Sequence, residues 1–226
     1  MKRLLLLTLG LTMICGAKAQ EEKLEIKPSG RILLDGGLFK ADGQDDKFND
    51  GFAIPDMRVG FSASYGAWKA KVDMGYAYGK VNMKDVFVQY NFDKEAADFL
   101  RAGYFIHQFG LQSATSSSFK ISMEEPASNQ AFNNSRMIGL MYQHTRSKFL
   151  GTLSFFTESD AMKMTSDKLG NQGVGMMTRL VYKPFCEPGK IFHVGLSGAF
   201  ETPRYSSDKE LSHHSYTLST TFPTRM

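Results

Sequence analysis

The stretch "YGAWKAKVDMGYAYG", residues 65–79, alternates strictly between two kinds of side chain. Apolar or aromatic residues occupy the even positions, beginning at Trp68, and charged or small residues occupy the odd positions, beginning at Lys69. Successive side chains of a β-strand point to opposite faces, so this stretch predicts a strand with one apolar and one polar face. In a soluble sandwich the apolar face would pack in a core. In an outer-membrane barrel it would contact lipid, and the polar face would line a water-filled interior.

The N-terminal residues 1–19 have the features of an export signal. Lys2 and Arg3 precede an apolar run over residues 4–15, and an A-x-A ending at Ala19 follows it. This order predicts a signal peptide cleaved after Ala19, which leaves residues 20–226 as the barrel domain. The run is too short for a membrane anchor. A lipoprotein signal ending at Cys15 is the weaker alternative, because the large Ile14 precedes that cysteine.

The charge and the cysteine count change once the predicted signal is removed. It holds three basic residues and no acidic one, and subtracting their charges from the formal net charge of +4 leaves +1. This balance does not indicate a nucleic-acid partner. Cys186 remains as a single cysteine, which excludes an intrachain disulfide and a thiolate metal cluster. The sequence therefore predicts no metal site and no cofactor.

Alternation of the same kind recurs along the chain and predicts ten strands. They cover residues 24–39, 52–65, 68–79, 83–92, 99–107, 137–145, 149–158, 173–183, 191–202 and 212–222. Most have 9 or more residues, enough for a tilted strand to cross a bilayer, whereas globular strands cluster near ~5–6 residues. Short connections contrast with long polar ones, and aromatic residues such as Trp68 and Tyr182 lie near strand ends. These features favour an all-β, antiparallel up-and-down transmembrane β-barrel.

If the apolar faces contact lipid, the polar faces line a lumen with a small excess of basic residues. Rings of Arg and Lys select anions, although a solvated wall of mixed charge is an alternative. The segment 110–136 is rich in hydroxyl side chains and longer than most loops of compact domains. It is expected either to fold inward and narrow the pore or to remain a surface loop.

The segment "AGYFIHQFGLQSATSSSFKISMEEPASNQAFNNSRMIGLMY", residues 102–142, resembles the signature of the phosphate-selective porin O and P family. The matching positions are Gly103, Phe105, Phe109, Gly110, Thr115, Ser116, Phe119, Met123, Glu124, Ala131, Phe132, Arg136 and Gly139. The earlier stretches "DMRVGFSASYGAWKAKVDMGYAYG" and "DVFVQYNF" also resemble elements of that family. The resemblance runs from about residue 30 to residue 158.

The resemblance implies a 16-stranded, trimeric, anion-selective outer-membrane porin with basic residues along the channel and a loop folded into it. The candidate channel-lining and anion-binding residues are Arg136, Arg58, Lys69, Lys71, Arg101 and Lys120. Arg136 has the same alternation as Ile138, whose face is expected to contact lipid. Arg136 can therefore alternatively lie at the base of the loop and not in the channel wall. The sequence departs from the family pattern at Ile106, Gln108 and Glu125, which replace lysine, proline and arginine.

Ten predicted strands are fewer than 16, and a truncated sheet would leave unpaired backbone edges in lipid. This favours an incomplete sequence over a closed ten-stranded barrel. The function expected is passive diffusion of small anions, with phosphate as a candidate, through a modestly basic lumen. The partners expected are outer-membrane lipid and two further copies of the chain in a homotrimer, with no nucleic acid.

Two other classes of function stay open. A soluble secreted β-sandwich that binds a ligand would show the same alternation. An outer-membrane barrel enzyme is less favoured, because the sequence has no H-E-x-x-H, G-x-S-x-G, G-x-G-x-x-G or P-loop motif. His213 and His214 are adjacent, hence on opposite faces of a strand, and cannot chelate one metal together.

Overall fold

The computed structural model describes residues 23–38, 50–77, 79–93, 97–116, 119, 135–157 and 173–202. These residues form nine strands and one short helix. The bounds are β1 Glu25–Gly37, β2 Gly51–Tyr65, β3 Trp68–Ala77, β4 Lys80–Asn91, β5 Phe99–Ile106, α2 Gly110–Ala114, β6 Arg136–Arg146, β7 Phe149–Thr157, β8 Val174–Glu187 and β9 Lys190–Glu201. The predicted signal peptide, the predicted strand over 212–222 and Lys120 lie outside the described residues.

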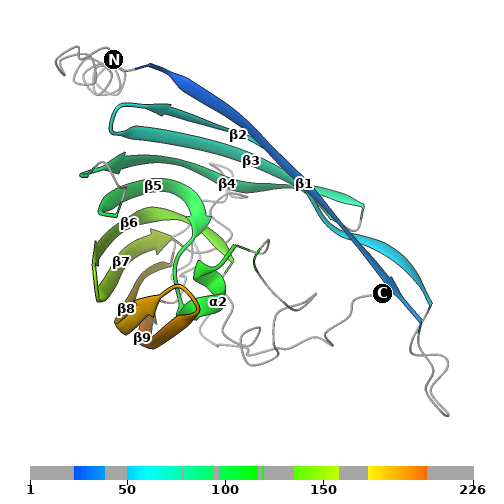
Figure 1. Ribbon diagram of the computed structural model, residues 1–226. Helices are drawn as coiled ribbons and strands as arrows, with labels where there is room; N and C mark the ends of the chain where they lie inside the picture. The colour runs from blue at the N-terminus through cyan, green and yellow to red at the C-terminus, as the bar shows by residue number, and fades with distance from the viewer. Residues whose placement is uncertain are drawn as a thin grey trace, which may run out of the picture.

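The nine strands form one antiparallel up-and-down sheet in which every strand pairs with its neighbours in sequence. The order is β1-β2-β3-β4-β5-β6-β7-β8-β9, and β1 and β9 are its edges, so the described sheet is open. Figure 1 shows that the sheet curls from β1 to β9 and that α2 lies on its concave side. We call the side that holds α2 the concave face and the opposite side the outer face. The all-β, antiparallel fold predicted from the alternation is confirmed.

Nine of the ten predicted strands are present, with shifts at their ends. β4 begins at Lys80 and not at residue 83, and β8 continues to Glu187, beyond the predicted end at residue 183. Both extensions come from tight turns. Gly79 has a φ of 78° and Gly189 a φ of 77°, so each glycine provides the left-handed conformation on which a two-residue hairpin turn depends.

The connections at the two ends of the sheet differ in length, as expected. At one end the chain turns over residues 66–67, 92–98, 147–148 and 188–189. At the other end it connects over residues 38–50, 78–79, 107–135 and 158–173. Barrels of the outer membrane have short periplasmic turns and longer extracellular loops. The arrangement of three long connections at one end fits that design.

Bulges in three strands change which side chains share a face. The register between β1 and β2 shifts near Pro55, and the register between β8 and β9 shifts near Pro184. Proline lacks the N–H that a ladder requires and is tolerated at such places. In β4, Val86 pairs with Val72 but Met83 pairs with Met74, so β4 has one extra residue. This last bulge turns successive side chains of β4 toward the same face.

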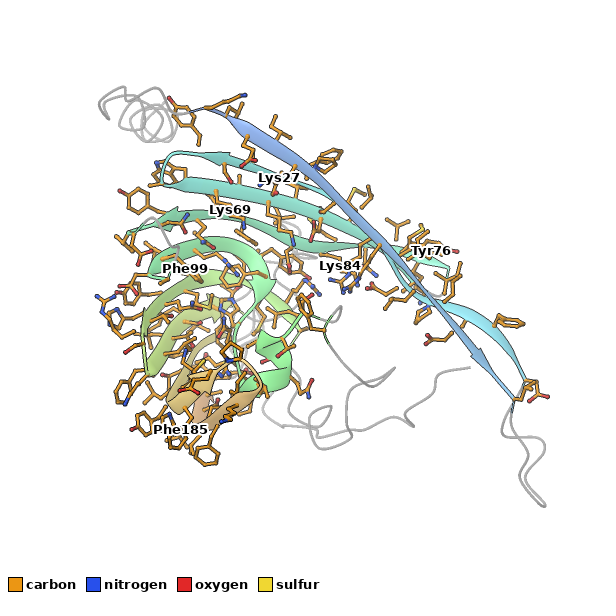
Figure 2. All side chains as sticks on the ribbon, in the orientation of Figure 1. Lys27, Lys69, Tyr76, Lys84, Phe99 and Phe185 are labelled. Atoms are coloured by element: carbon orange, nitrogen blue, oxygen red, sulfur yellow. The ribbon has the colours of Figure 1, made fainter. Side chains whose placement is uncertain are left out.

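The outer face is apolar and exposed. Val59 is 58% exposed, Val72 is 49% exposed and Leu196 is 72% exposed. Such a continuous exposed apolar surface is far larger than soluble monomers present and suits contact with lipid. In Figure 2, Phe185 lies on the outside of the curled sheet.

A band of aromatic side chains follows the outer face near the short-turn end. Ring centroids are 4.9 Å apart between Trp68 and Tyr90, and 6.0 Å apart between Phe92 and Tyr142. The band consists of Tyr65, Trp68, Tyr90, Phe92, Tyr142, Phe149 and Tyr182. Amphipathic rings at one level of a barrel are typical of the membrane–water interface. The expectation that aromatic residues would gather at strand ends is confirmed at this end.

The concave face is not polar throughout, which differs from the expected water-lined wall. Phe87, Phe99, Phe105 and Met141 form one buried cluster, and Met137, Phe156 and Met177 form another, against which Phe109 packs. These side chains have the parity assigned to the lumen. Arg101 lies over three rings of the first cluster, and Phe109, in the chain after β5, covers the second. Charged side chains gather instead on β1 to β4, with Arg101 of β5 and Arg136 of β6 beside them.

Candidate functional site

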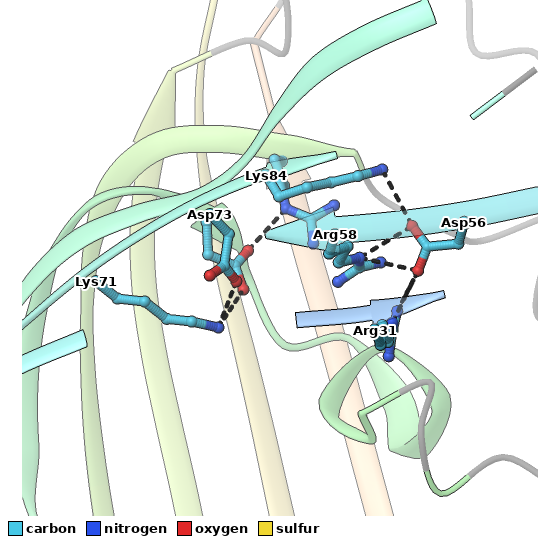
Figure 3. A network of polar contacts seen from close by, with 8 residues as sticks. Arg31, Asp56, Arg58, Lys71, Asp73 and Lys84 are labelled. Atoms are coloured by element: carbon cyan, nitrogen blue, oxygen red, sulfur yellow. Dashed lines mark hydrogen bonds and ion pairs between the residues drawn. The ribbon is translucent and has the colours of Figure 1, made fainter. Parts of the chain in front are cut away.

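Asp56 is the centre of a polar network on the concave face of β1, β2 and β4. It lies in β2 just after the bulge at Pro55, and its carboxylate accepts hydrogen bonds from Arg31 of β1 and Arg58 of β2. The Nε atoms of both arginines lie 3.0 Å from a carboxylate oxygen. Lys84 Nζ of β4 is 3.9 Å from Asp56 Oδ1. Three cations therefore share one carboxylate, as Figure 3 shows.

A second set of ion pairs joins β3, β4 and β6. Lys71 Nζ is 2.6 Å from Asp73 Oδ2 and 3.7 Å from Asp85 Oδ2. Arg136 Nε donates to Asp85 Oδ1 at 2.7 Å. The two sets together contain five cations and three carboxylates, a net charge of +2 counted over the described residues. The side chains are partly buried, and such charges interact more strongly than fully solvated ones.

Arg101 of β5 is held differently. Its Nε and Nη2 atoms donate to Gln89 Oε1 at 3.0 and 2.7 Å. Its guanidinium carbon lies 4.1 Å from the ring centroid of Phe87 and 4.9 Å from that of Phe99. Aromatic faces attract cations. No described carboxylate forms an ion pair with Arg101, so it adds a third positive charge to the concave face.

The segment after β5 crosses the concave face and forms hydrogen bonds with β6, β8 and β9. Gln108 Nε2 donates to Gln143 Oε1 of β6 at 3.3 Å, and Arg179 Nη1 of β8 donates to Gln108 Oε1 at 3.1 Å. The backbone N–H of Gly110 donates to Ser197 Oγ of β9 at 3.0 Å. A proline would have neither of the side-chain bonds of Gln108. The departure from the family pattern at this position thus gives the segment a tether.

His107 fastens the same segment to the apolar part of the concave face. Its ring is buried between the rings of Phe105 and Phe156, at centroid distances of 4.4 and 5.0 Å. Nε2 donates to the carbonyl of Met137 at 3.3 Å. Gly139 makes room for this ring, because an added Cβ there would lie 2.7 Å from His107 Cε1. The segment is therefore packed as well as hydrogen-bonded.

A cavity of about 650 Å³ lies between this segment and the strands β2 to β6. One of its sides is formed by residues 112–116, which include Gln112 and Ser113. Figure 2 shows Lys84 on the concave side of the sheet, and Lys84 also lines the cavity. Among the described residues, the basic ones that line it are Arg58, Lys71, Lys84, Arg101 and Arg136, and the acidic one is Asp85. This cavity is the candidate site.

Four of the six predicted site residues lie together in this cavity: Arg58, Lys71, Arg101 and Arg136. Lys69 does not line it. Lys69 lies on the same face, opposite Gln89 in the β3–β4 register. Lys120 lies outside the described residues. Arg136 is the first residue of β6, where the long connection returns to the sheet, and its side chain still reaches the cavity.

The sequence reasoning missed Lys84 and Arg31. Strict alternation counted back from Val88 and Val86 places Lys84 on the outer face. The bulge in β4 turns both Lys84 and Asp85 to the concave face, where Lys84 meets Asp56 and Asp85 meets Arg136. A lysine next to an aspartate inside an apolar alternation is a signal of such a bulge. Arg31 was missed because its strand lies at the edge of the recognised pattern.

No helix in the described part of the chain is long and apolar enough to cross a membrane. The described residues also contain no group of three or more His, Cys, Asp or Glu side chains that could hold a metal ion. Neither a curated protein nor a solved structure matches the chain significantly. A family model does match. The model of the phosphate-selective porin O and P family matches residues 26–225, nearly the whole chain, and the chain therefore belongs to that family.

Proposed function

We propose that the protein is an outer-membrane channel that lets small anions diffuse passively through a modestly basic lumen. Family membership supports an outer-membrane porin. The observation that carries the anion preference is the cavity, whose described lining has five basic side chains and one carboxylate. Fixed cations near a narrow water path raise the local concentration of anions and oppose the passage of cations.

The charge balance of the whole network supports the same direction of selectivity. Asp56, Asp73 and Asp85 compensate part of the positive charge but leave an excess. These ion pairs also hold the cationic side chains at fixed positions on β2, β3 and β6. A preorganised cation stabilises a passing anion without first reorganising. The excess is modest, so the expected selectivity is a preference among ions and not complete exclusion of cations.

Phosphate is the anion that the family description names, and the chemistry of the cavity suits it. Arg58, Arg101 and Arg136 offer planar guanidinium groups, which bind phosphate oxygens in pairs, and Lys71 adds a point charge. The long segment 110–136 would narrow the lumen. Its described beginning, residues 110–116, already lies beside the cavity.

Two further features belong to this proposal. Export would remove residues 1–19, and the mature chain would assemble as a homotrimer in lipid. Mass spectrometry of the protein from outer membranes would show the cleavage at Ala19, and a native gel in mild detergent would show the subunit number. Neither feature is needed for the anion preference of a single lumen.

A soluble sandwich and a barrel enzyme are the rival functions. The exposed apolar outer face predicts a protein that needs detergent or lipid to stay in solution, whereas a sandwich would not. The protein is proposed to act as a channel and not as an enzyme. Hydrolysis of a chromogenic ester by the refolded protein would favour the enzyme instead.

The test of the proposed function is the zero-current potential in planar bilayers. With a tenfold KCl gradient across the membrane, we expect the sign that marks chloride as the more permeable ion. Added phosphate is expected to reduce the chloride current if it binds in the lumen. A potential of the opposite sign would refute the anion preference. A chloride preference that phosphate leaves unchanged would refute phosphate as a bound ion.

A further inference from the structure

Most cations of the cavity form an ion pair with a carboxylate, whereas Arg101 forms none with a described carboxylate. The ion pairs are 2.9 Å long for Arg58 Nε with Asp56, 2.6 Å for Lys71 with Asp73 and 2.7 Å for Arg136 with Asp85. The two hydrogen bonds of Arg101 instead go to the neutral amide oxygen of Gln89. The charge of Arg101 is thus fixed in place by neutral groups, and Asp85 attracts it only from beyond ion-pair distance.

Three aromatic rings also hold Arg101 in position, and like the amide of Gln89 they carry no net charge. Its guanidinium lies over Phe87 at 4.1 Å, and the centroids of Phe99 and Phe105 lie at 4.9 and 5.5 Å. The quadrupole of a ring attracts a cation, but the ring carries no net charge. These contacts therefore leave the positive charge of Arg101 uncancelled by any ion pair with a described carboxylate. Arg101 also lines the cavity, so its charge acts where we propose that anions pass.

Gln89 lies between two cations that have no ion pair with a described carboxylate. In the register of the sheet it is opposite Lys69 on β3 and opposite Arg101 on β5. Its side chain is 4% exposed, and its Nε2 donates to Asn91 Oδ1 at 2.6 Å. That bond fixes the amide so that Oε1 points at Arg101. A glutamate here could accept the same bonds from Arg101, but it would cancel one of the two charges.

We infer that Gln89 is a specificity-determining residue because its side chain is neutral. Its neutral amide orients Arg101 while leaving the positive charges of Arg101 and Lys69 available to small anions. The inference rests on the proposed anion conduction. If Gln89 had a purely structural role, only the loss of its hydrogen bonds would change the selectivity. We expect instead that a negative charge at position 89 lowers the selectivity.

The experiment compares three channels by their chloride-to-potassium permeability ratio in planar bilayers. Gln89→Glu is expected to lower the ratio about threefold or more, the size of a unit charge acting on an ion roughly 7 Å away in water. Gln89→Met removes the bonds to Arg101 but no charge, and it should keep most of the selectivity. Arg101→Gln should lower the ratio about as much as Gln89→Glu. Heat-dependent gel mobility would confirm that each variant folds.

The matched control is Gln143→Glu. Gln143 lies on the concave face of β6, outside the cavity lining, so this variant makes the same substitution without placing a carboxylate on Arg101. The ratio should fall less for Gln143→Glu than for Gln89→Glu. Equal losses in the two variants, a ratio unchanged in Gln89→Glu, or an equal loss in Gln89→Met would each overturn the role of Gln89. A wild-type channel that does not prefer anions would refute the proposed function itself, which is a separate result.

Discussion

Arg136 of β6 donates to Asp85 of β4 at 2.7 Å, across the intervening strand β5. Asp85 also lies 3.7 Å from Lys71 on β3. A single carboxylate thus reduces the effective charge of two cations that line the cavity. Since no other described residue of the lining is acidic, Asp85 is the main described group in the cavity that opposes the anion preference.

Replacing Asp85 with asparagine is therefore expected to raise anion selectivity. An asparagine can keep a hydrogen bond with Arg136, while the negative charge disappears. The chloride-to-potassium permeability ratio should rise about twofold to threefold, as expected for one unit charge near the ion path in water. Glu187→Gln is the control, because it removes an exposed carboxylate at the end of β8, outside the cavity. A ratio that falls, or that rises equally in both variants, would contradict this account of Asp85.

Gly139→Ala is expected to destabilise the barrel by about 1–3 kcal/mol, the usual cost of overpacking. An added Cβ would lie 2.3 Å from the carbonyl oxygen of Phe155 and 2.7 Å from His107 Cε1, so strand or ring must move. Urea unfolding in detergent micelles, followed by gel mobility, measures the loss. Gly198→Ala is the control, because the nearest atom there is Thr178 Cγ2 at 3.9 Å. Equal stability of the two variants would show that His107 is not packed against Gly139 as described.

Asp98 predicts a specific loss of stability in acid. It lies in the connection between β4 and β5, and the backbone N–H of Thr145 donates to its Oδ1 at 2.8 Å. This bond, with help from His144 and Arg146, lowers the pKa of Asp98 from its ordinary value of 3.8. A carboxyl whose pKa is lower in the folded state stabilises the fold above its unfolded pKa, and this contribution disappears as the pH falls through the folded pKa.

Asp98→Asn should therefore unfold at a lower temperature than the wild type near pH 7, and the difference should vanish as the pH falls below about 4. Melting temperatures measured across this pH range are the check. Glu25→Gln is the control, because the ion pair of Glu25 with Lys27 is largely exposed and contributes little. A difference that persists in strong acid would mean that ionisation of Asp98 does not stabilise the turn.

Trp68 is the single tryptophan of the chain, and it lies in the aromatic band of the outer face. Its ring packs against Tyr90 with a centroid distance of 4.9 Å. In lipid vesicles, its fluorescence is expected to be quenched by lipids brominated near the headgroup and little affected by aqueous iodide. The double variant Trp68→Phe/Lys69→Trp should show the opposite pattern. Strong iodide quenching of the wild type would place the band outside the membrane interface.

Alternation was enough to predict most of the fold. Outside the bulges in β4 and β8, the strands from Trp68 onward follow a simple period because their two faces have different surroundings. The bulge near Lys84 could not be predicted in this way, because it depends on pairing with β3 and breaks the period only locally. The cluster around Met137 and Phe156 was also missed. Their parity indicated a wet wall, and only the folding of a distant segment over them explains their burial.

Four of the six predicted cations line one cavity, and the alternation of the strands accounts for the face on which most of them lie. The sequence pattern did not predict which side chains would pair across the concave face. The bond between Arg179 and Gln108 joins residues 71 positions apart, and its geometry depends on how the segment after β5 crosses the sheet. The face of Gln89 follows from its alternation with Val88 and Tyr90, but its contact with Arg101 depends on the register between β4 and β5.

The central claim is that the charged concave face borders water and the apolar outer face borders lipid. Lys71→Cys and Val72→Cys, each made with Cys186→Ser, place a thiol on neighbouring residues of β3 that point to opposite faces. A membrane-impermeant, negatively charged thiosulfonate reagent added to single channels is the measurement. We expect it to modify the cysteine at position 71 and to reduce the chloride current, and to leave the channel with the cysteine at position 72 unchanged. Modification and loss of current at position 72, with none at position 71, would contradict the account.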